Sequence, residues 1–271
     1  MKKRYVVISS NLNDDYLFWV PLVTYAWNKL AWNVILLCSD YQKVSRFDYV
    51  KSQFFLFSKD NEIFQWSEGL FSYDEITICQ VSRLYAASMV MEDPLILTSD
   101  CDMMPLSNYW KPKFGDISCY GRDLSDRHQP MCYVSMSGNN WINVMNLRGN
   151  FIADIERDLR DRHDVNSFDP EEKWVVDQNL LTERLKERLV VNIERGNHEN
   201  GYPIGRIDRS SWSRSLNQKE RIDCHLPKEG YIRINFNKVM EVIKDCLKPT
   251  EDEIKWMLDY RERYVQLMQT T

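Results

Sequence analysis

The fold of this chain is indicated by residues 94–102, which read Pro-Leu-Ile-Leu-Thr-Ser-Asp-Cys-Asp. Residues 95–98 predict a short buried strand, and Pro94 separates it from the segment before it. Asp100 and Asp102 come directly after this strand. Because residues i and i+2 of an extended backbone point to the same side, both carboxylates are expected to face one point.

Two carboxylates that face one point repel each other unless a cation lies between them. Their oxygens suit a hard ion such as Mg²⁺ or Mn²⁺. The carboxyl ends of parallel strands are also where open α/β sheets bind nucleotides, so a divalent ion there would hold a diphosphate. A helix cap followed by a surface charge is the alternative interpretation. The context of a buried strand favours a metal site at Asp100 and Asp102.

Outward from this segment, apolar runs alternate with helical patterns, which is typical of an α/β fold. Strands are expected at 5–8, 32–38, 95–98 and 116–120, with a half-buried strand at 141–145. Helices are expected at 18–30, 80–91, 152–163 (exposed), 171–189, 237–247 and 250–268, and most of 195–231 is expected to be loop. With no internal repeat or evident linker, the chain is expected to form one domain.

The composition excludes several classes of protein. The 271 residues are 44% hydrophobic and 28% charged, which predicts a folded globular chain and argues against disorder. Lys and Arg total 35 against 40 for Asp and Glu, and this balance argues against nucleic acid as a main partner.

No stretch approaches the roughly 20 apolar residues of a membrane span, and the first ten residues do not resemble a signal peptide. The seven cysteines contain no C-x-x-C pair, which predicts reduced thiols and a cytoplasmic location.

Residues 80–85 (Gln-Val-Ser-Arg-Leu-Tyr), followed by residues 94–102, resemble the central motif of the GT-A glycosyltransferases. The likeness is closest to the retaining family 8 type, which includes glycogenin and bacterial lipopolysaccharide galactosyltransferases. In that family a helix with an Arg-Leu pair leads to a strand that ends in D-x-D. Other segments resemble the family in the same order. They are residues 9–30 with Asp15-Tyr16, residues 133–138 (Y-F-N-S-G in the family), residues 175–181 (D-Q-D-x-L-N) and residues 225–228 (H-x-x-G-x-x-K-P-W). The chain departs from the family pattern at Ser135, at Asn179 and after His225, which is the one residue of the last segment that matches.

This resemblance implies a GT-A, Rossmann-like α/β fold with a mostly parallel central sheet flanked by helices. Residues 1–130 would form a nucleotide-binding half, residues 131–235 a donor and acceptor half, and residues 236–271 a helical C-terminal segment. The implied activity is metal-dependent glycosyl transfer with retention. A hexose or pentose would pass from a nucleotide-sugar, expected to be a UDP-sugar, to a glycan, glycoprotein or glycolipid acceptor.

The resemblance also implies a third metal ligand. His225 would join Asp100 and Asp102 in holding Mn²⁺ or Mg²⁺, and an imidazole suits Mn²⁺ better. The alternative for His225 is a surface position in a polar loop. Arg83 would hold a diphosphate or a sugar hydroxyl with its forked guanidinium, and its alternative is a salt bridge on the helix surface.

Further positions are candidates for binding the nucleotide-sugar. Ser9, Asn11 and Tyr16, at the end of the first strand, would bind a uracil base and ribose by hydrogen bonds and stacking, unless they only shape a turn. Gly138 belongs to the segment that resembles Y-F-N-S-G. Asp123 is a candidate for binding the donor sugar, although its charged surroundings also fit a solvated loop.

Asp177 and Gln178 are the candidates for the reacting centre. Asp177 would orient hydroxyls of the donor sugar, and Gln178 would lie beside the anomeric carbon. The alternative for Asp177 is an acid at a helix N-terminus, which the helix dipole favours. Trp212, in a polar stretch, is a candidate for lining an acceptor groove.

Three other functions share part of this pattern. A haloacid-dehalogenase-type phosphatase has a strand followed by D-x-D, but near its start and with different residues after the pair. A sugar nucleotidyltransferase would carry a Gly-rich loop after the first strand, and residues 9–15 contain no Gly. A non-catalytic protein that binds a nucleotide-sugar or glycan stays open, although Asp100, Asp102, Asp177 and His225 together favour an enzyme.

Overall fold

A computed structural model describes residues 2–11, 13–40, 45–67, 69–110, 117–120, 129–160, 175–187, 193–195, 198–199, 202–203, 205–212 and 221–270. Within these residues a seven-stranded sheet has the order β3-β2-β1-β4-β7-β6-β8. Its strands are β1 (Arg4–Ser10), β2 (Asn33–Asp40), β3 (Glu62–Ser67), β4 (Leu95–Thr98), β6 (Ile117–Cys119), β7 (Val134–Ser137) and β8 (Ile193–Arg195). In this sheet β7 runs antiparallel to both of its neighbours, and the other pairs are parallel. The expected mostly parallel α/β sheet is confirmed.

A smaller sheet of three strands lies beside the central one. It contains β5 (Met103–Pro105), β11 (Arg206–Ile207) and β12 (Asp223–His225), with β12 in the middle. β12 pairs antiparallel with β5, so His225 is opposite Met103. Two further short strands, β9 (His198–Glu199) and β10 (Tyr202–Pro203), form a separate pair. The region 195–231, expected to be loop, therefore contains short strands where it is described.

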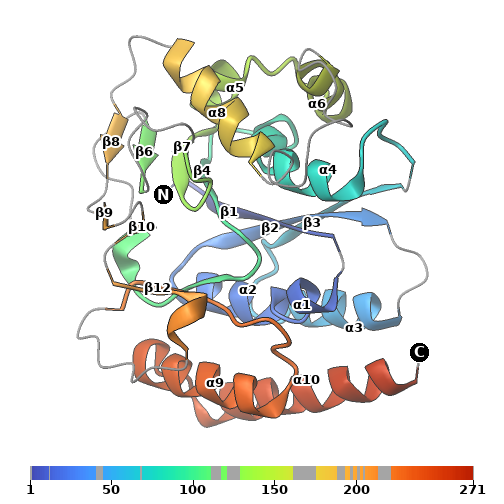
Figure 1. The fold of residues 1–271 in the computed structure, drawn as a ribbon, viewed down its shortest axis with the longest axis vertical. Coiled ribbons are helices and arrows are strands. Elements are labelled where there is room, and N and C mark those ends of the chain that lie inside the picture. Colours follow the sequence, from blue (N-terminus) through green and yellow to red (C-terminus); the bar gives the residue numbers. More distant parts are fainter. Residues whose placement is uncertain are drawn as a thin grey trace.

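Helices cover both faces of the central sheet (Figure 1). On one face lie α1 (Asp14–Leu17), α2 (Val20–Lys29) and α3 (Ser45–Phe54), with α9 (Arg233–Leu247) and α10 (Glu251–Gln269) outside them. On the other face lie α4 (Glu75–Ser82), the 3₁₀ helix η1 (Arg83–Ser88), α5 (Gly138–Met145), α6 (Phe151–Arg160) and α8 (Val176–Glu187). The helices expected at the C-terminal end of the chain are confirmed.

The two hydrophobic cores follow from the alternation of side chains along β1. Val6 and Ile8 face the core shared with α2, α9 and α10, whereas Tyr5 and Val7 face the core shared with α4, α5 and α8. Successive side chains of a strand point to opposite faces, so a fully buried strand is apolar throughout. The short apolar run of β1 is therefore the expected sequence of a central strand.

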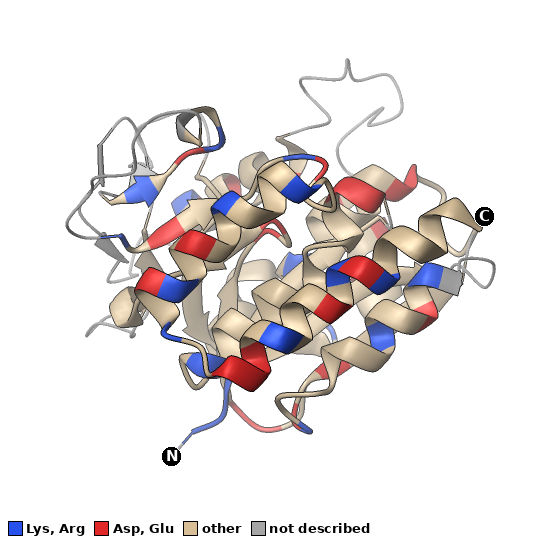
Figure 2. Ribbon diagram, turned by 90° about the horizontal axis from the view of Figure 1, so that it is seen from below, with Lys and Arg blue, Asp and Glu red and all other residues tan. Residues whose placement is uncertain are grey.

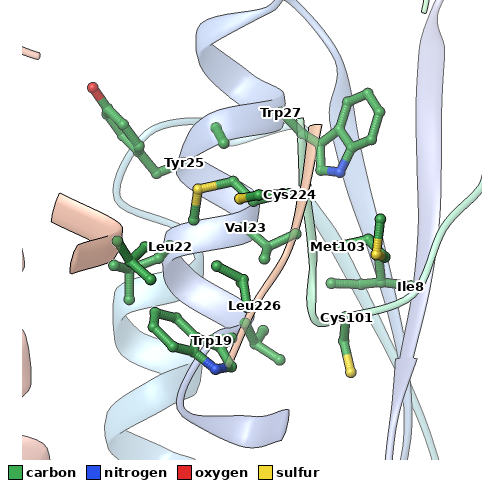
Figure 3. Close-up of a cluster of buried hydrophobic side chains, with 14 of the residues drawn as sticks. Ile8, Trp19, Leu22, Val23, Tyr25, Trp27, Cys101, Met103, Cys224 and Leu226 are labelled. Carbon is green, nitrogen blue, oxygen red and sulfur yellow. The ribbon is translucent and has the colours of Figure 1, made fainter. Parts of the chain in front are cut away.

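Helix α2 is buried almost all round because it lies between the sheet and the C-terminal helices. Its residues 20–27 are all buried, which is the composition expected of a helix covered on every side. Figure 3 shows side chains of this helix packed beside Met103, Cys224 and Leu226, which come from β5, β12 and the residue after β12. This core therefore supports the segments that carry Asp102 and His225.

Two of the expected elements need correction, and two further elements were missed. Residues 141–145 belong to helix α5 and not to a strand, because Trp141, Val144 and Met145 are buried at helical spacing. In a segment of five residues this spacing cannot be distinguished from the alternating pattern of a half-buried strand. The helix expected at 80–91 begins at Glu75 and changes to 3₁₀ geometry at Arg83. Helix α3 and strand β3 were not expected.

The C-terminal helices α9 and α10 form an outer surface of the molecule. Figure 2 shows acidic and basic residues interspersed along both helices. Thr250 begins α10 with a capping box to Glu253, which satisfies the first backbone N–H groups of the helix. In the part of the chain that the structure describes, no helix is both long and apolar enough to cross a membrane.

Candidate active site

A pocket of about 450 Å³ lies at the edge of the sheet where β1 and β4 end. The two strands are parallel and Val7 pairs with Thr98, so the residues that follow each strand leave the sheet at the same edge. The structure places most of the residues expected from the sequence in the lining of this one pocket: Ser9, Asn11, Tyr16, Arg83, Asp100, Asp102, Asp177, Gln178 and His225.

Arg83 connects two of the pocket's carboxylates. Its Nη1 donates to Asp100 Oδ1 and, at 3.0 Å, to the carbonyl oxygen of Ser99. Its Nη2 donates to Asp177 Oδ2 at 2.7 Å. The side chains of Arg83 and Asp177 are only 5% and 2% exposed, so the helix-surface salt bridge considered for Arg83 is excluded. A charged pair at this depth is stable only because each charge has its partner.

The electrostatics of Asp177 and Asp100 differ. Burial raises the pKa of Asp177 to about 6, although Arg83 opposes the shift. Burial also acts to raise the pKa of Asp100, but the Arg83 guanidinium outweighs it and holds this pKa below its usual range. The Asp100 carboxylate additionally accepts a hydrogen bond from the Cys132 thiol, with 2.7 Å between Sγ and Oδ2. Asp100 is therefore a stable anion in the pocket wall, whereas Asp177 titrates closer to neutrality.

Asp102 and His225 are brought together by the pairing of β5 with β12. The backbone N–H of Leu226 donates to the Asp102 carbonyl at 2.8 Å, which fixes the two segments side by side. His225 Nε2 lies 3.3 Å from Asp102 Oδ2, and His225 Nδ1 lies 3.8 Å from Asp208 Oδ1. Asp102 Oδ2 also accepts a hydrogen bond from Arg209 Nη2.

The local geometry of Asp100 and Asp102 differs from the expectation. They lie in a turn between β4 and β5, closed by the Met103 N–H donating to the Asp100 carbonyl at 3.2 Å, and not in extended backbone. Both nevertheless line the pocket. Among the described residues, no three His, Cys, Asp or Glu side chains form a cluster ready to hold a metal ion.

Gly138 does not belong to this site. β7 runs antiparallel to β4, with Ser137 opposite Leu95, so Gly138 lies at the amino end of β4, across the sheet from the pocket. Its N–H donates to the Pro94 carbonyl at 2.8 Å. The motif can be read from the sequence, but the direction of the strand that carries it cannot. Asp123 lies outside the described residues.

Trp212 is also placed differently from the expectation. It is 6% exposed and belongs to the core that contains α2, so it does not line a groove. Its Nε1 donates to the His225 carbonyl at 2.7 Å. The indole therefore supports the strand that carries His225.

The pocket contains residues that the sequence analysis missed. Arg206, Arg209 and Cys132 line it. Arg206 is held by Asp223, with 2.7 Å between Nη2 and Oδ2, and its guanidinium lies 5.8 Å from the centre of the Tyr133 ring. No spacing rule connects these residues with the carboxylates after β4. The density of Arg in residues 206–214 was the one available signal.

A buried polar network lies behind the pocket. Asp158 of α6 accepts a hydrogen bond from the Tyr85 hydroxyl at 2.8 Å, from Arg157 Nε at 2.7 Å and from Arg184 Nη2 at 3.1 Å. Tyr85 is in η1, which begins with Arg83, and Arg184 is in α8, which carries Asp177. The helix at 152–163 was expected to be exposed, but its Asp158 is buried and connects the two elements that position the Arg83 pair.

Solved structures of glycosyltransferases share this architecture. The galactosyltransferase LgtC, solved with donor and acceptor sugar analogues, aligns with a TM-score of 0.52 and 11% identity over 92% of this chain and 98% of that one. The apo form of the glycosyltransferase GlyE of Streptococcus pneumoniae TIGR4 aligns with a TM-score of 0.50 and 12% identity over 91% of this chain and 62% of that one. The chain has the GT-A fold. At these identities the likeness is one of fold, and the fold implied by the family 8 resemblance is confirmed.

No protein-family model matches the sequence, and no curated protein matches it either. The GT-A fold places the pocket at the carboxyl edge of the parallel strands, the usual place for ligands in open α/β sheets.

Proposed function

We propose that this GT-A protein is a metal-dependent glycosyltransferase that moves a sugar from a UDP-sugar to a glycan or glycoconjugate acceptor with retention. The observation that carries the proposal is the convergence of Asp100, Asp102, Asp177, Arg83 and His225 on one pocket. These residues come from four separate parts of the chain. A residue that served only as a surface charge or a helix cap would not require the other residues to lie beside it.

The charges of the pocket support a divalent cation. Among the residues that the structure describes, three arginines (Arg83, Arg206 and Arg209) and four aspartates (Asp100, Asp102, Asp177 and Asp208) line it, and Asp223 lies behind Arg206. Carboxylates therefore outnumber guanidinium groups, so a diphosphate would be repelled without further positive charge.

The donor atoms available also suit such an ion. Carboxylate and imidazole groups are ligands of Mn²⁺, and carboxylates are ligands of Mg²⁺. Asp100, Asp102 and His225 would hold the ion after Asp102 releases Arg209 and binds the ion in its place. When bound, the ion would neutralise the negative charge of the diphosphate leaving group.

The nucleoside would bind where β1 ends. Ser9, Asn11 and Tyr16 line that side of the pocket. Burial raises the pKa of Tyr16 to about 12, so its hydroxyl stays protonated and able to donate to a base or ribose. Asn11 offers both a donor and an acceptor at this position.

The sugar would lie toward the start of α8. Asp177 is fixed there by Arg83 and by the Gln178 N–H, which donates to its Oδ1 at 2.8 Å. A carboxylate fixed in this way would orient sugar hydroxyls, and the Gln178 amide oxygen would face positive charge that develops on the anomeric carbon.

The experiment that tests this function is a titration of UDP and of a panel of UDP-, GDP- and dTDP-sugars, with and without Mn²⁺, followed by calorimetry and by release of nucleotide. We expect UDP to bind only with the metal and a UDP-sugar to release UDP slowly in the absence of an acceptor. Asp102→Asn should abolish the metal-dependent binding, and Arg263→Gln on the surface of α10 is the control. Binding without turnover on any acceptor would favour a non-catalytic nucleotide-sugar-binding protein, and unchanged UDP affinity in Asp102→Asn would remove the metal assignment.

A further inference from the structure

The three arginines of the pocket are held to different degrees. The side chains of Arg83 and Arg206 are 5% and 7% exposed. Arg206 donates through Nε and Nη2 to the buried Asp223, and Arg83 donates through Nη2 to the buried Asp177 and through Nη1 to Asp100. Arg209 is 29% exposed. It begins η4 (Arg209–Ser211), a single short 3₁₀ turn at the rim of the pocket. Arg209 is therefore the least confined of these three guanidinium groups.

Arg209 makes two contacts of different kinds. Its Nε donates to the Leu226 carbonyl at 3.0 Å, and its Nη2 donates to Asp102 Oδ2. The first contact anchors the base of the guanidinium to the strand segment that carries His225. The second places a positive charge on a carboxylate of the proposed cation site.

These two contacts allow an exchange of partners. The Leu226 N–H is bonded to the Asp102 carbonyl, so the backbone around both contacts is fixed and movement is confined to the side chain. A guanidinium and a divalent cation repel each other, so a cation on the Asp102 carboxylate would weaken the contact between Arg209 and Asp102. The end of the guanidinium can turn about its Nε anchor into the pocket, where a diphosphate offers it a forked pair of acceptor oxygens.

We propose that Arg209 is a diphosphate-binding residue that changes partners: it holds Asp102 in the free protein and turns to the diphosphate when Asp102 takes the cation. This inference rests on the proposed function and assigns to it a residue outside the sequence motifs. Arg209 keeps the cation site neutralised when no donor is present, and couples filling of that site to capture of the donor.

The exchange predicts opposite effects of one substitution on two affinities. In Arg209→Gln the competitor for Asp102 is gone, so Mn²⁺ alone should bind about fivefold more tightly, on the scale of one partly exposed charged hydrogen bond. UDP in saturating Mn²⁺ should bind about tenfold more weakly, because a guanidinium contact to phosphate is lost. A residue that only supports the fold would not move the two affinities in opposite directions.

The test measures Mn²⁺ binding by electron paramagnetic resonance and UDP binding by calorimetry in the wild type, Arg209→Gln and Arg263→Gln. The last variant removes the same charge from the exposed face of α10 and corrects for the change in net charge. If Arg209→Gln does not fold, Arg209→Lys replaces it. Its ammonium lacks the separate Nε and Nη2 donors that bond Leu226 and Asp102 in the wild type, and it cannot offer a diphosphate a forked pair of N–H groups. We therefore expect the same two changes in affinity, each smaller than in Arg209→Gln.

Tighter Mn²⁺ binding together with weaker UDP binding supports the exchange. If the wild type binds Mn²⁺ and UDP but both affinities are unchanged in the Arg209 variant, the partner exchange is overturned and the proposed function stands. If the wild type binds no divalent cation, the metal-dependent function and the exchange are both overturned.

Discussion

Removing the charge of Arg83 should make the stability of this protein strongly dependent on pH between pH 6 and pH 8. Arg83 is the ion-pair partner of Asp177, whose side chain is 2% exposed. In Arg83→Gln the Asp177 carboxylate would be buried without a counter-charge, and such a group takes up a proton. Asp100, whose side chain is 43% exposed, is reached by water and can stay ionised.

The magnitude follows from proton linkage. Burial raises the pKa of Asp177 to about 6 in the folded wild type, above the value of about 3.9 for an unfolded chain. Because the folded state binds this proton more tightly than the unfolded state, the raised pKa adds to the free energy of unfolding at low pH, and this contribution is lost as the pH rises through the folded-state pKa. In the wild type the loss is therefore complete just above pH 6. In Arg83→Gln the pKa is higher still, and the loss continues at up to about 1.4 kcal/mol per pH unit. Between pH 6 and pH 8 the variant should therefore lose about 2 to 3 kcal/mol relative to the wild type.

The assay is urea unfolding at several values between pH 5 and pH 8, followed by tryptophan fluorescence. The double variant Arg83→Gln/Asp177→Asn has no group to titrate at this place, so its stability should again parallel that of the wild type above pH 6. Parallel curves for the wild type and Arg83→Gln would refute the reasoning, because Asp177 would then have enough water or another partner.

Other substitutions test the reacting centre and the packing around it. Asp177→Asn should lower turnover, measured by UDP release, by about two orders of magnitude, with less than about a tenfold change in UDP affinity. Gln178→Ala should lower turnover by a smaller factor in the same assay. Asp158→Ala should lower the free energy of unfolding by about 1–3 kcal/mol, since it leaves the buried Tyr85 hydroxyl without its acceptor and removes one acceptor of the half-buried Arg157 and Arg184; an unchanged denaturation midpoint would contradict this. Gly230→Ala should destabilise the protein by at least about 1–3 kcal/mol in the same assay, because a Cβ at this position would overlap the Trp19 ring; a stability equal to that of the wild type would show that the ring moves freely.

The buried strands and the long helices were predictable because their signals are local. The run 95–98 is β4 with the expected limits, and Pro249 separates α9 from α10, since proline cannot continue a helix. The error at 141–145 arose because a five-residue apolar pattern fits both a strand and one turn of a helix. Tertiary contacts of Trp141 with the core decided in favour of the helix.

The sequence by itself determined the α/β class of the fold and indicated nine of the residues that line the pocket. Runs of apolar residues define the strands. Because β1 and β4 are parallel, Ser9 and Asp100 lie at the same edge of the sheet, independently of the conformation of the segments between them. Only the tertiary structure decided the partners of each charge. The antiparallel direction of β7 removed Gly138 from the pocket, and the pairing of β12 with β5 brought His225 to Asp102, beside Arg209. The contacts of Asp102 with Arg209 and His225 join residues 107 and 123 positions apart. They depend on hydrogen bonds between strands that no local pattern of side chains specifies.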